Sequence, residues 1–409
     1  MTRISIIILL VLSSVKQNSS AQEKATFFQQ DKLTGNWNGK RDTIASKGIT
    51  AEVDFTTYYQ GAFSGTGYND FDLGGRADAL INFDTEKLKL WRGGGIHTHL
   101  TYRFGNAPAF RGGALWPVNT GGILPLGAKD KLVATSIYMS QRWNTSMLMI
   151  GKINAVDLMA NDPFFGGWGN QRFMNLAFVA PPSGVVPPVI IGAIYSYRIK
   201  QYILTAMVFD PNDRTKDYWP SDIFANGVNL SLNGQWDGDM FDRKTSFSLG
   251  ATYSTQNQID LEEILLPPGL QAGTKSGAYN ISAKFSHLLL ESNMHQGQGL
   301  GIYGRGAIAD GNPNPIKSSF SGGLAGHKII SRRPNDSFGI GYFYYDFSDQ
   351  LRNAVDQILE VGSEQGVEVF YNMALTPWFR ISANMAWGRP ADRSKDDLFI
   401  GSLRVNIRF

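Results

Sequence analysis

The last thirteen residues of the chain, Asp397 to Phe409, alternate with a period of two from Phe399 onward. Apolar or small side chains take every second position and end at the terminal Phe409. The positions between them are polar from residue 402 on: Ser402, Arg404, Asn406 and Arg408. This pattern predicts a β-strand whose two faces meet different surroundings. Outer-membrane barrels usually close on such a strand, but a soluble protein can also end in an edge strand.

The first 21 residues have the three parts of a secretory signal peptide. Arg3 supplies a positive charge, Ile4 to Val15 form an apolar run broken only by serines, and Ser19 to Ala21 offer a cleavage site of small residues. We therefore expect residues 1–21 to be a signal peptide, which is too short to cross a bilayer as a helix.

Composition excludes several other classes of protein. After the signal peptide no run of about twenty apolar residues remains, so no transmembrane helix is predicted. The chain has no cysteine, and 38 basic against 35 acidic residues leave it close to neutral, which argues against a nucleic-acid partner. Its 45 glycines and 12% aromatic residues suit a β-barrel, whose apolar and polar faces average out.

Beyond residue 48, sixteen segments alternate in the same way, an even number, as in single-chain bacterial barrels. They lie near residues 50–60, 73–84, 94–104, 131–142, 146–153, 190–198, 201–209, 226–235, 244–254, 277–286, 298–308, 318–328, 336–345, 367–376, 379–387 and 397–409. Most are long enough to cross hydrocarbon as a tilted strand. Residues 49–409 are therefore expected to form a barrel, and residues 22–48 a periplasmic arm with a short helix at Thr43 to Lys47.

The connections between these segments mostly alternate between short and long. The short ones are 143–145, 199–200, 236–243 and 377–378. The long ones are 105–130, 154–189, 210–225, 255–276 and 346–366. Barrels place short turns in the periplasm and long loops outside, whereas a soluble sandwich predicts no such parity. One predicted periplasmic turn, at 287–297, is longer than this rule allows. The chain is nevertheless predicted to be all-β, a transmembrane antiparallel barrel of about 16 strands.

Two motifs resemble functional signatures but lie in the wrong context. Gly299, Gly301 and Gly304 match the spacing of a dinucleotide fingerprint, yet they lie within a predicted strand with no helix after it. A second set has the spacing of one helix face and of a zinc site, but lies between strands: His287, Glu291 and His295. No nucleophile–histidine pair is recognisable. The sequence therefore predicts no catalytic residue, no metal site, no cofactor and no enzyme activity.

A barrel of about sixteen strands leaves an aqueous channel, so no central apolar core is expected. Polar side chains on its strands are candidates for the channel wall: His97, His99, Arg103, Arg142, Arg305, Glu368 and Arg380. The connection at 154–189 is far longer than a hairpin turn and adds four candidates: Asp162, Trp168, Gln171 and Arg172. Because such long loops are mostly functional, we expect it to fold inward and narrow the channel. A packed extracellular lid without selectivity is the alternative.

A mixture of aromatic and polar side chains suits neutral sugars. Sugar C–H faces stack on aromatic rings, and sugar hydroxyls bond to arginine, carboxylate and amide groups. A more uniformly basic lining would instead favour anions, and the strand candidates lean basic. Sugar selectivity and a general or anion-leaning small-solute channel therefore both stay open from the residues alone.

Eight segments, spread over the mature chain, resemble carbohydrate-selective porins of the OprB family. They are 33–39 (LTGNWNG), 208–210 (VFD), 302–315 (IYGRGAIADGNPNP), 322–326 (GGLAG), 333–341 (RPNDSFGIG), 368–371 (EVFY), 375–378 (LTPW) and 404–409 (RVNIRF). The resemblance implies a sixteen-stranded barrel in the bacterial outer membrane, with membrane lipid around it. It also implies passive diffusion of monosaccharides such as glucose through a basic constriction flanked by aromatic residues.

The resemblance further implies that the terminal Phe409 is recognised by the barrel-assembly machinery. Met147 and Met149 stand where relatives are often more polar, so the preferred sugar is not carried over. A sugar-binding outer-membrane receptor that does not conduct is the second alternative. Whether the chain forms a homo-oligomer is left open.

Overall fold

The structure, a computed structural model, describes residues 26–67, 69–106, 114, 117–160, 162, 164, 168, 170–180, 185–218, 220–265, 272–292 and 295–409. The expected signal peptide, residues 1–21, lies outside these residues.

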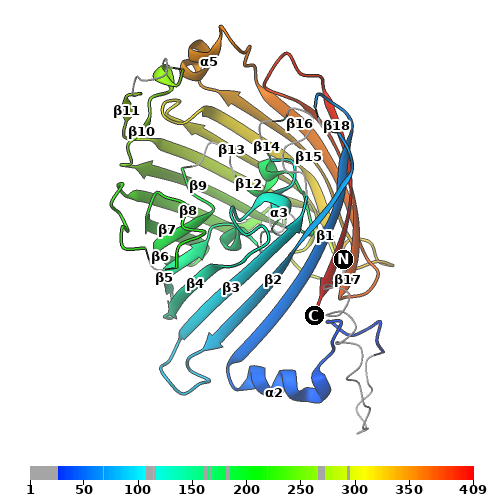
Figure 1. The fold of residues 1–409 in the computed structure, drawn as a ribbon. Helices are drawn as coiled ribbons and strands as arrows, with labels where there is room; N and C mark the ends of the chain where they lie inside the picture. The colour runs from blue at the N-terminus through cyan, green and yellow to red at the C-terminus, as the bar shows by residue number, and fades with distance from the viewer. Residues whose placement is uncertain are drawn as a thin grey trace.

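Sixteen antiparallel strands close into one barrel, in which β18 pairs with β1 (Figure 1). They are β1 Ile49–Ser64, β2 Asp72–Asp84, β3 Gly94–Gly105, β4 Leu132–Arg142, β5 Ser146–Asn154, β6 Val189–Ile199, β7 Tyr202–Phe209, β8 Asn229–Met240, β9 Arg243–Ser254, β12 Tyr279–Glu291, β13 Gly299–Ala309, β14 Ile316–His327, β15 Ser337–Phe347, β16 Glu364–Ala374, β17 Phe379–Arg389 and β18 Leu398–Arg408. Each predicted segment coincides with one of these strands, so the predicted fold class is confirmed.

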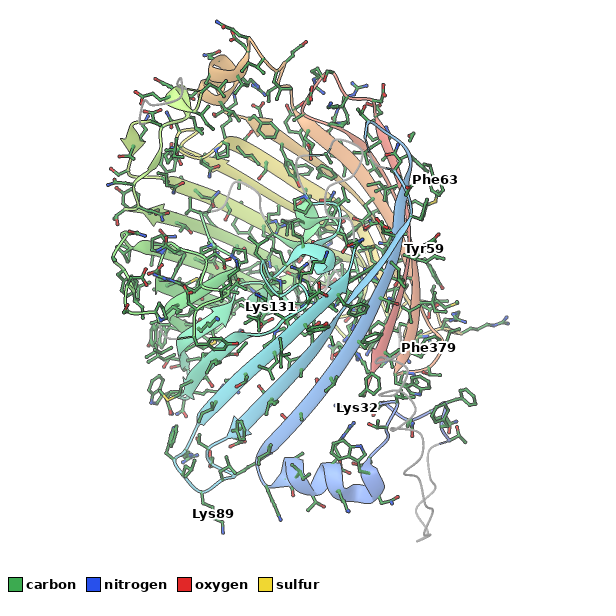
Figure 2. The ribbon with its side chains drawn as sticks, in the orientation of Figure 1. Lys32, Tyr59, Phe63, Lys89, Lys131 and Phe379 are labelled. Carbon is green, nitrogen blue, oxygen red and sulfur yellow. The ribbon has the colours of Figure 1, made fainter. Side chains whose placement is uncertain are left out.

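β1 illustrates how the alternation places side chains. Thr56 and Tyr58 are fully buried on the inner face of the barrel. Tyr59 and Phe63 are exposed, and Figure 2 shows them on the outer side of β1. An outward row of apolar side chains is what a strand facing hydrocarbon requires. The closing strand follows the same rule, because Leu403 is exposed and its neighbour Arg404 is completely buried.

The connections define two ends of the barrel, called the turn end and the loop end below. Tight turns at 143–145, 200–201, 241–242 and 375–378 lie at the turn end. The long connections 106–131, 155–188, 210–228, 255–278 and 348–363 lie at the loop end. Three loop-end connections, 65–71, 310–315 and 390–397, are short.

Two turn-end connections are shorter than predicted because the strands before them run further. β8 continues to Met240, and Phe241 and Asp242, with φ angles of 53° and 56°, make a two-residue hairpin turn. β12 continues to Glu291, which reduces the exceptional connection to residues 292–298.

Short helices and a two-stranded sheet lie at the two ends of the barrel and in the loops that enter it. They are η1 Trp37–Gly39, α2 Lys40–Ser46, α3 Thr120–Ile123, η2 Asp157–Met159, α4 Leu176–Val179, β10 Gln258–Ile259, η3 Leu261–Glu263, β11 Thr274–Lys275 and α5 Asp349–Val355. Figure 1 shows α2 at the turn end and α5 at the loop end. α2 overlaps the helix predicted at 43–47 but begins earlier. Within the described ranges, no helix combines the length and the apolar character needed to cross a membrane.

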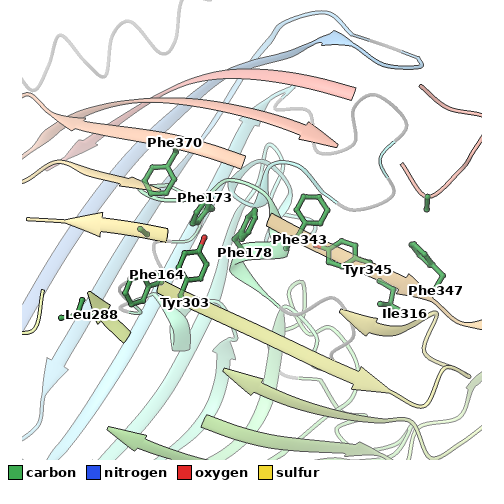
Figure 3. Packing of buried hydrophobic residues seen from close by; sticks show 13 residues of the cluster. Phe164, Phe173, Phe178, Leu288, Tyr303, Ile316, Phe343, Tyr345, Phe347 and Phe370 are labelled. Carbon is green, nitrogen blue, oxygen red and sulfur yellow. The ribbon is translucent and has the colours of Figure 1, made fainter. Parts of the chain in front are cut away.

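An aromatic core fills one side of the barrel, contrary to the expectation of an interior without a core. Phe164, Phe173 and Phe178, from the loop between β5 and β6, pack on the inner faces of strands β13 to β16 (Figure 3). The ring centroids of Phe173 and Phe178 are 4.3 Å apart, and that of Phe173 lies 4.8 Å from Phe370. The ring of Phe164 stacks on Tyr303 at 5.5 Å. Burying several aromatic rings in this way is strongly stabilising.

Glycines on the inner wall make room for these rings. A β-carbon at Gly341 would lie 2.5 Å from a ring carbon of Phe178, and one at Gly301 would lie 2.7 Å from Phe164. Gly301 belongs to the glycine motif at 299–304, which lies on β13 as predicted. At Gly301 the motif provides space for a loop side chain.

Candidate functional site

The loop between β5 and β6, residues 155–188, enters the barrel and is called the constriction loop. Glu368 of β16 holds it by accepting hydrogen bonds from the backbone N–H groups of Met174, at 2.7 Å, and Asn175, at 2.9 Å. Asn384 donates a third bond to the same carboxylate at 2.8 Å. The Glu368 side chain is only 2% exposed, so these donors, and not water, must stabilise its negative charge.

Two buried arginines donate to carbonyl groups of the same loop. Arg305 of β13 donates to the carbonyl of Ala177 at 3.0 Å, and Arg404 of β18 donates to that of Arg172 at 2.9 Å. Hydrogen bonds from an ionised donor are stronger than neutral ones. These bonds fasten the constriction loop to the wall at β13, β16 and β18.

The connection between β3 and β4 also enters the barrel, and α3 lies inside it (Figure 1). The backbone N–H of Thr120 donates to the carbonyl of Met174 in the constriction loop at 2.7 Å. Asn119 donates to Gln60 of β1 at 3.0 Å, and Arg103 donates to the carbonyl of Gly122. The two inserted loops thus support one another. All the loop residues predicted from the sequence to line the channel belong to the constriction loop, and none to the loop between β3 and β4.

A buried charge network ties the start of the constriction loop to β2 and β3. His99 contacts Asp78 through Nε2 at 2.9 Å and Asp157 of η2 through Nδ1 at 2.9 Å. Arg76 forms a two-point ion pair with Asp78, and Ser136 donates to Asp157 at 2.8 Å. His99 therefore bridges a carboxylate of the wall and a carboxylate of the loop.

Trp168 lies directly beside this network, at the inner part of the constriction loop. Its ring centroid is 5.3 Å from that of His99, and its backbone φ is 51°, in the left-handed region that few non-glycine residues adopt. Two residues further on, Asn170 accepts a hydrogen bond from the hydroxyl of Tyr58, which is fully buried. The position of Trp168 is thus set by contacts on both sides.

A cavity of about 820 Å³ opens from the constriction loop toward the turn end of the barrel. Its lining combines one indole ring with polar groups, among them His97, Gln171, Arg172 and Arg380. His97 contacts Asn82 at 2.7 Å and Ser140 at 2.8 Å, and its ring stacks on Tyr138. Ring faces and hydrogen-bonding groups therefore face the same space.

The structure divides the predicted pore-lining residues into four groups. Six line the cavity: His97, His99, Trp168, Gln171, Arg172 and Arg380. Asp162 instead forms an ion pair with Lys284 at 2.7 Å, which attaches the constriction loop to β12. Arg103, Arg305 and Glu368 face inward but are buried beneath the two loops. Arg142 lies exposed at the turn-end rim of β4.

Three residues of the charge network were not predicted from the sequence: Arg76, Asp78 and Asp157. Arg404 was predicted only as one of the polar positions of the closing strand. Arg76 and Asp78 are two positions apart and so share the inward face of β2, a signal that period-two counting can detect. Asp157 belongs to a loop, where no period applies. Arg404 does face inward, but the constriction loop covers it completely.

The residues with the spacing of a zinc site, His287, Glu291 and His295, do not lie on a helix. His287 and Glu291 lie on the strand β12, so the three residues cannot share a helix face. His287 contacts Thr245 at 2.8 Å. The zinc interpretation, which the sequence already disfavoured, is therefore wrong on geometric grounds.

Comparison with solved structures identifies porins. The high-pH structure of Pseudomonas putida OprB superposes with a TM-score of 0.81 at 17% identity, covering 94% of this chain and 100% of that chain. The low-pH structure of the same protein gives 0.59 at 12% identity, covering 93% and 99%. A loop-deletion mutant of OmpT from Vibrio cholerae gives 0.51 at 12% identity, covering 88% and 99%. At such identities these similarities establish the fold alone.

Sequence comparison supplies the family. No curated protein sequence matches the chain. The family model of the carbohydrate-selective porins, OprB family, matches residues 69–409, which is most of the barrel. The chain therefore belongs to the OprB family of carbohydrate-selective porins, outer-membrane channels rather than enzymes.

Proposed function

We propose that this porin passes monosaccharides such as glucose by passive diffusion, and that the constriction loop selects them. The proposal involves no catalysis and no energy coupling. Trp168 offers a ring for the C–H face of a sugar, while Gln171 and Arg172 offer hydrogen-bonding groups for its hydroxyls. Weak contacts of both kinds permit entry and release, as conduction requires.

One observation carries the proposal: an aromatic ring and several polar groups line the same cavity of about 820 Å³. The loops around it are fastened by buried hydrogen bonds, so the lining is pre-organised. Asp162 acts in this scheme as a fastener through Lys284, and Arg103, Arg305 and Glu368 act as anchors.

Influx measurements test this proposal against a receptor that does not conduct. The purified protein in liposomes is expected to admit glucose and to give single-channel conductance in planar bilayers. A correctly folded protein without glucose influx would exclude the sugar channel, and conductance without any preference for sugars would indicate a general small-solute porin.

We further propose an orientation in the outer membrane, the compartment to which the family belongs. Removal of residues 1–21 would release the chain into the periplasm, where the turn end and α2 lie. The periplasmic arm, residues 22–48, supports this arrangement through its described part, because the backbone N–H of Leu33 donates to the carbonyl of Arg408 at 2.8 Å. The barrel wall then meets membrane lipid through its exposed apolar side chains.

The terminal Phe409 is proposed as the signal for the barrel-assembly machinery. Its backbone N–H donates to the carbonyl of Val53 at 2.8 Å, so the last residue closes the seam between β18 and β1. Deleting Phe409 should lower the amount of assembled barrel in cells far more than the conductance of barrels that do form. Equal assembly with and without Phe409 would remove this proposal.

A further inference from the structure

Three cations face the turn-end part of the cavity, and none of them forms an ion pair with another described residue. Arg172 belongs to the constriction loop, Lys328 to the turn before β15, and Arg380 to β17, and all three line the cavity. The charge of Arg172 acts on Arg380, and the charges of Arg172 and Lys328 both act on the neighbouring His327. The three groups therefore form one positive cluster.

The hydrogen bonds that the two arginines donate to described residues go to neutral acceptors, and the carboxylates of Asp162, Asp336 and Asp54 act on them only through space. Arg172 donates to the backbone carbonyl of Asp162, whose carboxylate pairs with Lys284 instead. Arg380 donates to the carbonyl of Asn335 at 2.9 Å and to the Asn372 side chain at 3.0 Å, both neutral acceptors. Its Nε is buried and has no acceptor among the described residues.

Most carboxylates of the same cavity are already occupied by other groups. Glu52 pairs with Lys32 at 3.2 Å, and Asp54 pairs with Arg408 at 3.6 Å. Asp157 is bound to His99 at 2.9 Å. Asp31, on the arm, remains as an acidic group that no described residue pairs. The part of the cavity wall formed by Arg172, Lys328 and Arg380 therefore carries a net positive charge.

We infer that this cluster, called the cationic wall, binds the anionic group of a monosaccharide derivative, a carboxylate or a phosphate. Arginine and lysine together are the side chains that hold such groups. The remainder of the solute would lie toward Trp168 and Gln171, the neutral part of the same lining. The inference rests on the proposed sugar channel and adds a second solute class, acidic sugars.

Uptake of labelled glucose, gluconate and glucose 6-phosphate into proteoliposomes that hold the full mature chain tests the inference. Lys328→Gln is the test variant, and Lys89→Gln is its matched control. Both lysines lie in turn-end turns with positive φ, 54° and 61°, but Lys89 lies at the tip of the β2–β3 turn, outside the cavity (Figure 2).

At low ionic strength, Lys328→Gln should lower the ratio of gluconate to glucose uptake about threefold, the size expected for one charge at short range in a watery cavity. Lys89→Gln should leave this ratio unchanged. For the wild type, raising the salt from about 0.1 M to about 1 M should lower the ratio, because salt screens exposed charges. The measurement at two salt concentrations uses only the wild type, so it does not depend on whether Lys328→Gln folds.

Equal ratios in the two variants, or a wild-type ratio that does not change with salt, would overturn the cationic wall while glucose uptake leaves the sugar channel intact. Absence of glucose uptake in the wild type would overturn both. Comparison of gluconate with glucose 6-phosphate identifies which anionic group is preferred, and a preference for either supports the inference.

Discussion

Nη2 of Arg404, a residue of the closing strand, donates a 2.9 Å hydrogen bond to the backbone carbonyl of Arg172 in the constriction loop. The strand that seals the barrel is thus also one of the strands that hold the loop. Arg404 is completely buried, so this contact cannot be replaced by bulk water without opening the loop.

Replacing Arg404 should loosen the constriction loop without preventing barrel closure. Arg404→Met keeps most of the buried volume but leaves the carbonyl of Arg172 without its donor, which costs about 1–3 kcal/mol. Amides at 170–180 should then exchange roughly tenfold faster with deuterated solvent, by the usual relation of free energy to opening equilibrium. Arg408→Gln, at the rim of the same strand, is the control and should leave their exchange unchanged.

Glu368 should be the most sensitive anchor, because it satisfies two backbone N–H groups at once. Glu368→Ala leaves both donors buried and unpaired, at about 1–3 kcal/mol each. Glu368→Gln retains one acceptor oxygen and should lose less. Single-channel conductance should therefore rise in the order wild type, Glu368→Gln, Glu368→Ala, and equal conductance in all three would show that the loop is held elsewhere.

The inner glycines should be intolerant of even a methyl group where they touch the loop. Gly341→Ala would place a carbon 2.5 Å from the Phe178 ring, so the aromatic core must shift at a cost of about 1–3 kcal/mol. Gly306→Ala is the matched control, because its nearest neighbour atom would be 3.7 Å away. Thermal unfolding in detergent should distinguish the variants, and equal melting temperatures would contradict the packing described.

The barrel could be predicted from the sequence because a strand period needs only neighbouring residues. The position of a constriction cannot be obtained in this way. Glu368 and His97 both face inward by alternation, yet one is buried under a loop and the other lines the cavity. The difference arises because a loop more than a hundred residues away in the sequence packs over Glu368 and donates the Met174 N–H to it, whereas His97 stays uncovered.

Loop length indicated that residues 154–189 are functional, and Trp168, Gln171 and Arg172 do line the cavity. The loop at 106–131 gave no comparable signal, because its inserted part carries few charged or aromatic side chains. Its role rests on backbone groups, such as the bond from Thr120 to Met174, which any residue types can make.

The loop at 210–228 should respond to acid. Asp210 is buried, which opposes its ionisation, but hydrogen bonds from Arg214 and from the N–H of Phe224 prevail and hold its pKa below the usual value. Since the folded state lowers this pKa, the stabilisation is present above about pH 4 and is lost as the pH falls through the folded-state pKa.

Hydrogen exchange of the described amides of this loop, corrected for the intrinsic effect of pH, checks that expectation. Protection should be constant from pH 7 to about pH 4 and fall below it. Asp210→Asn should show reduced protection already at pH 7, and its protection should not fall further in acid. If the protection of the wild type falls well above pH 5, a group other than Asp210 is responsible.

Uptake ratios for a series of sugars in Trp168→Ala and Arg172→Ala measure whether the constriction loop selects the sugar. Both variants should keep an assembled barrel with nearly unchanged unfolding temperature, while the ratios among glucose, other monosaccharides and a disaccharide change. Unchanged ratios in both variants, with the barrel intact, would contradict selection by the constriction loop and place selectivity elsewhere in the channel.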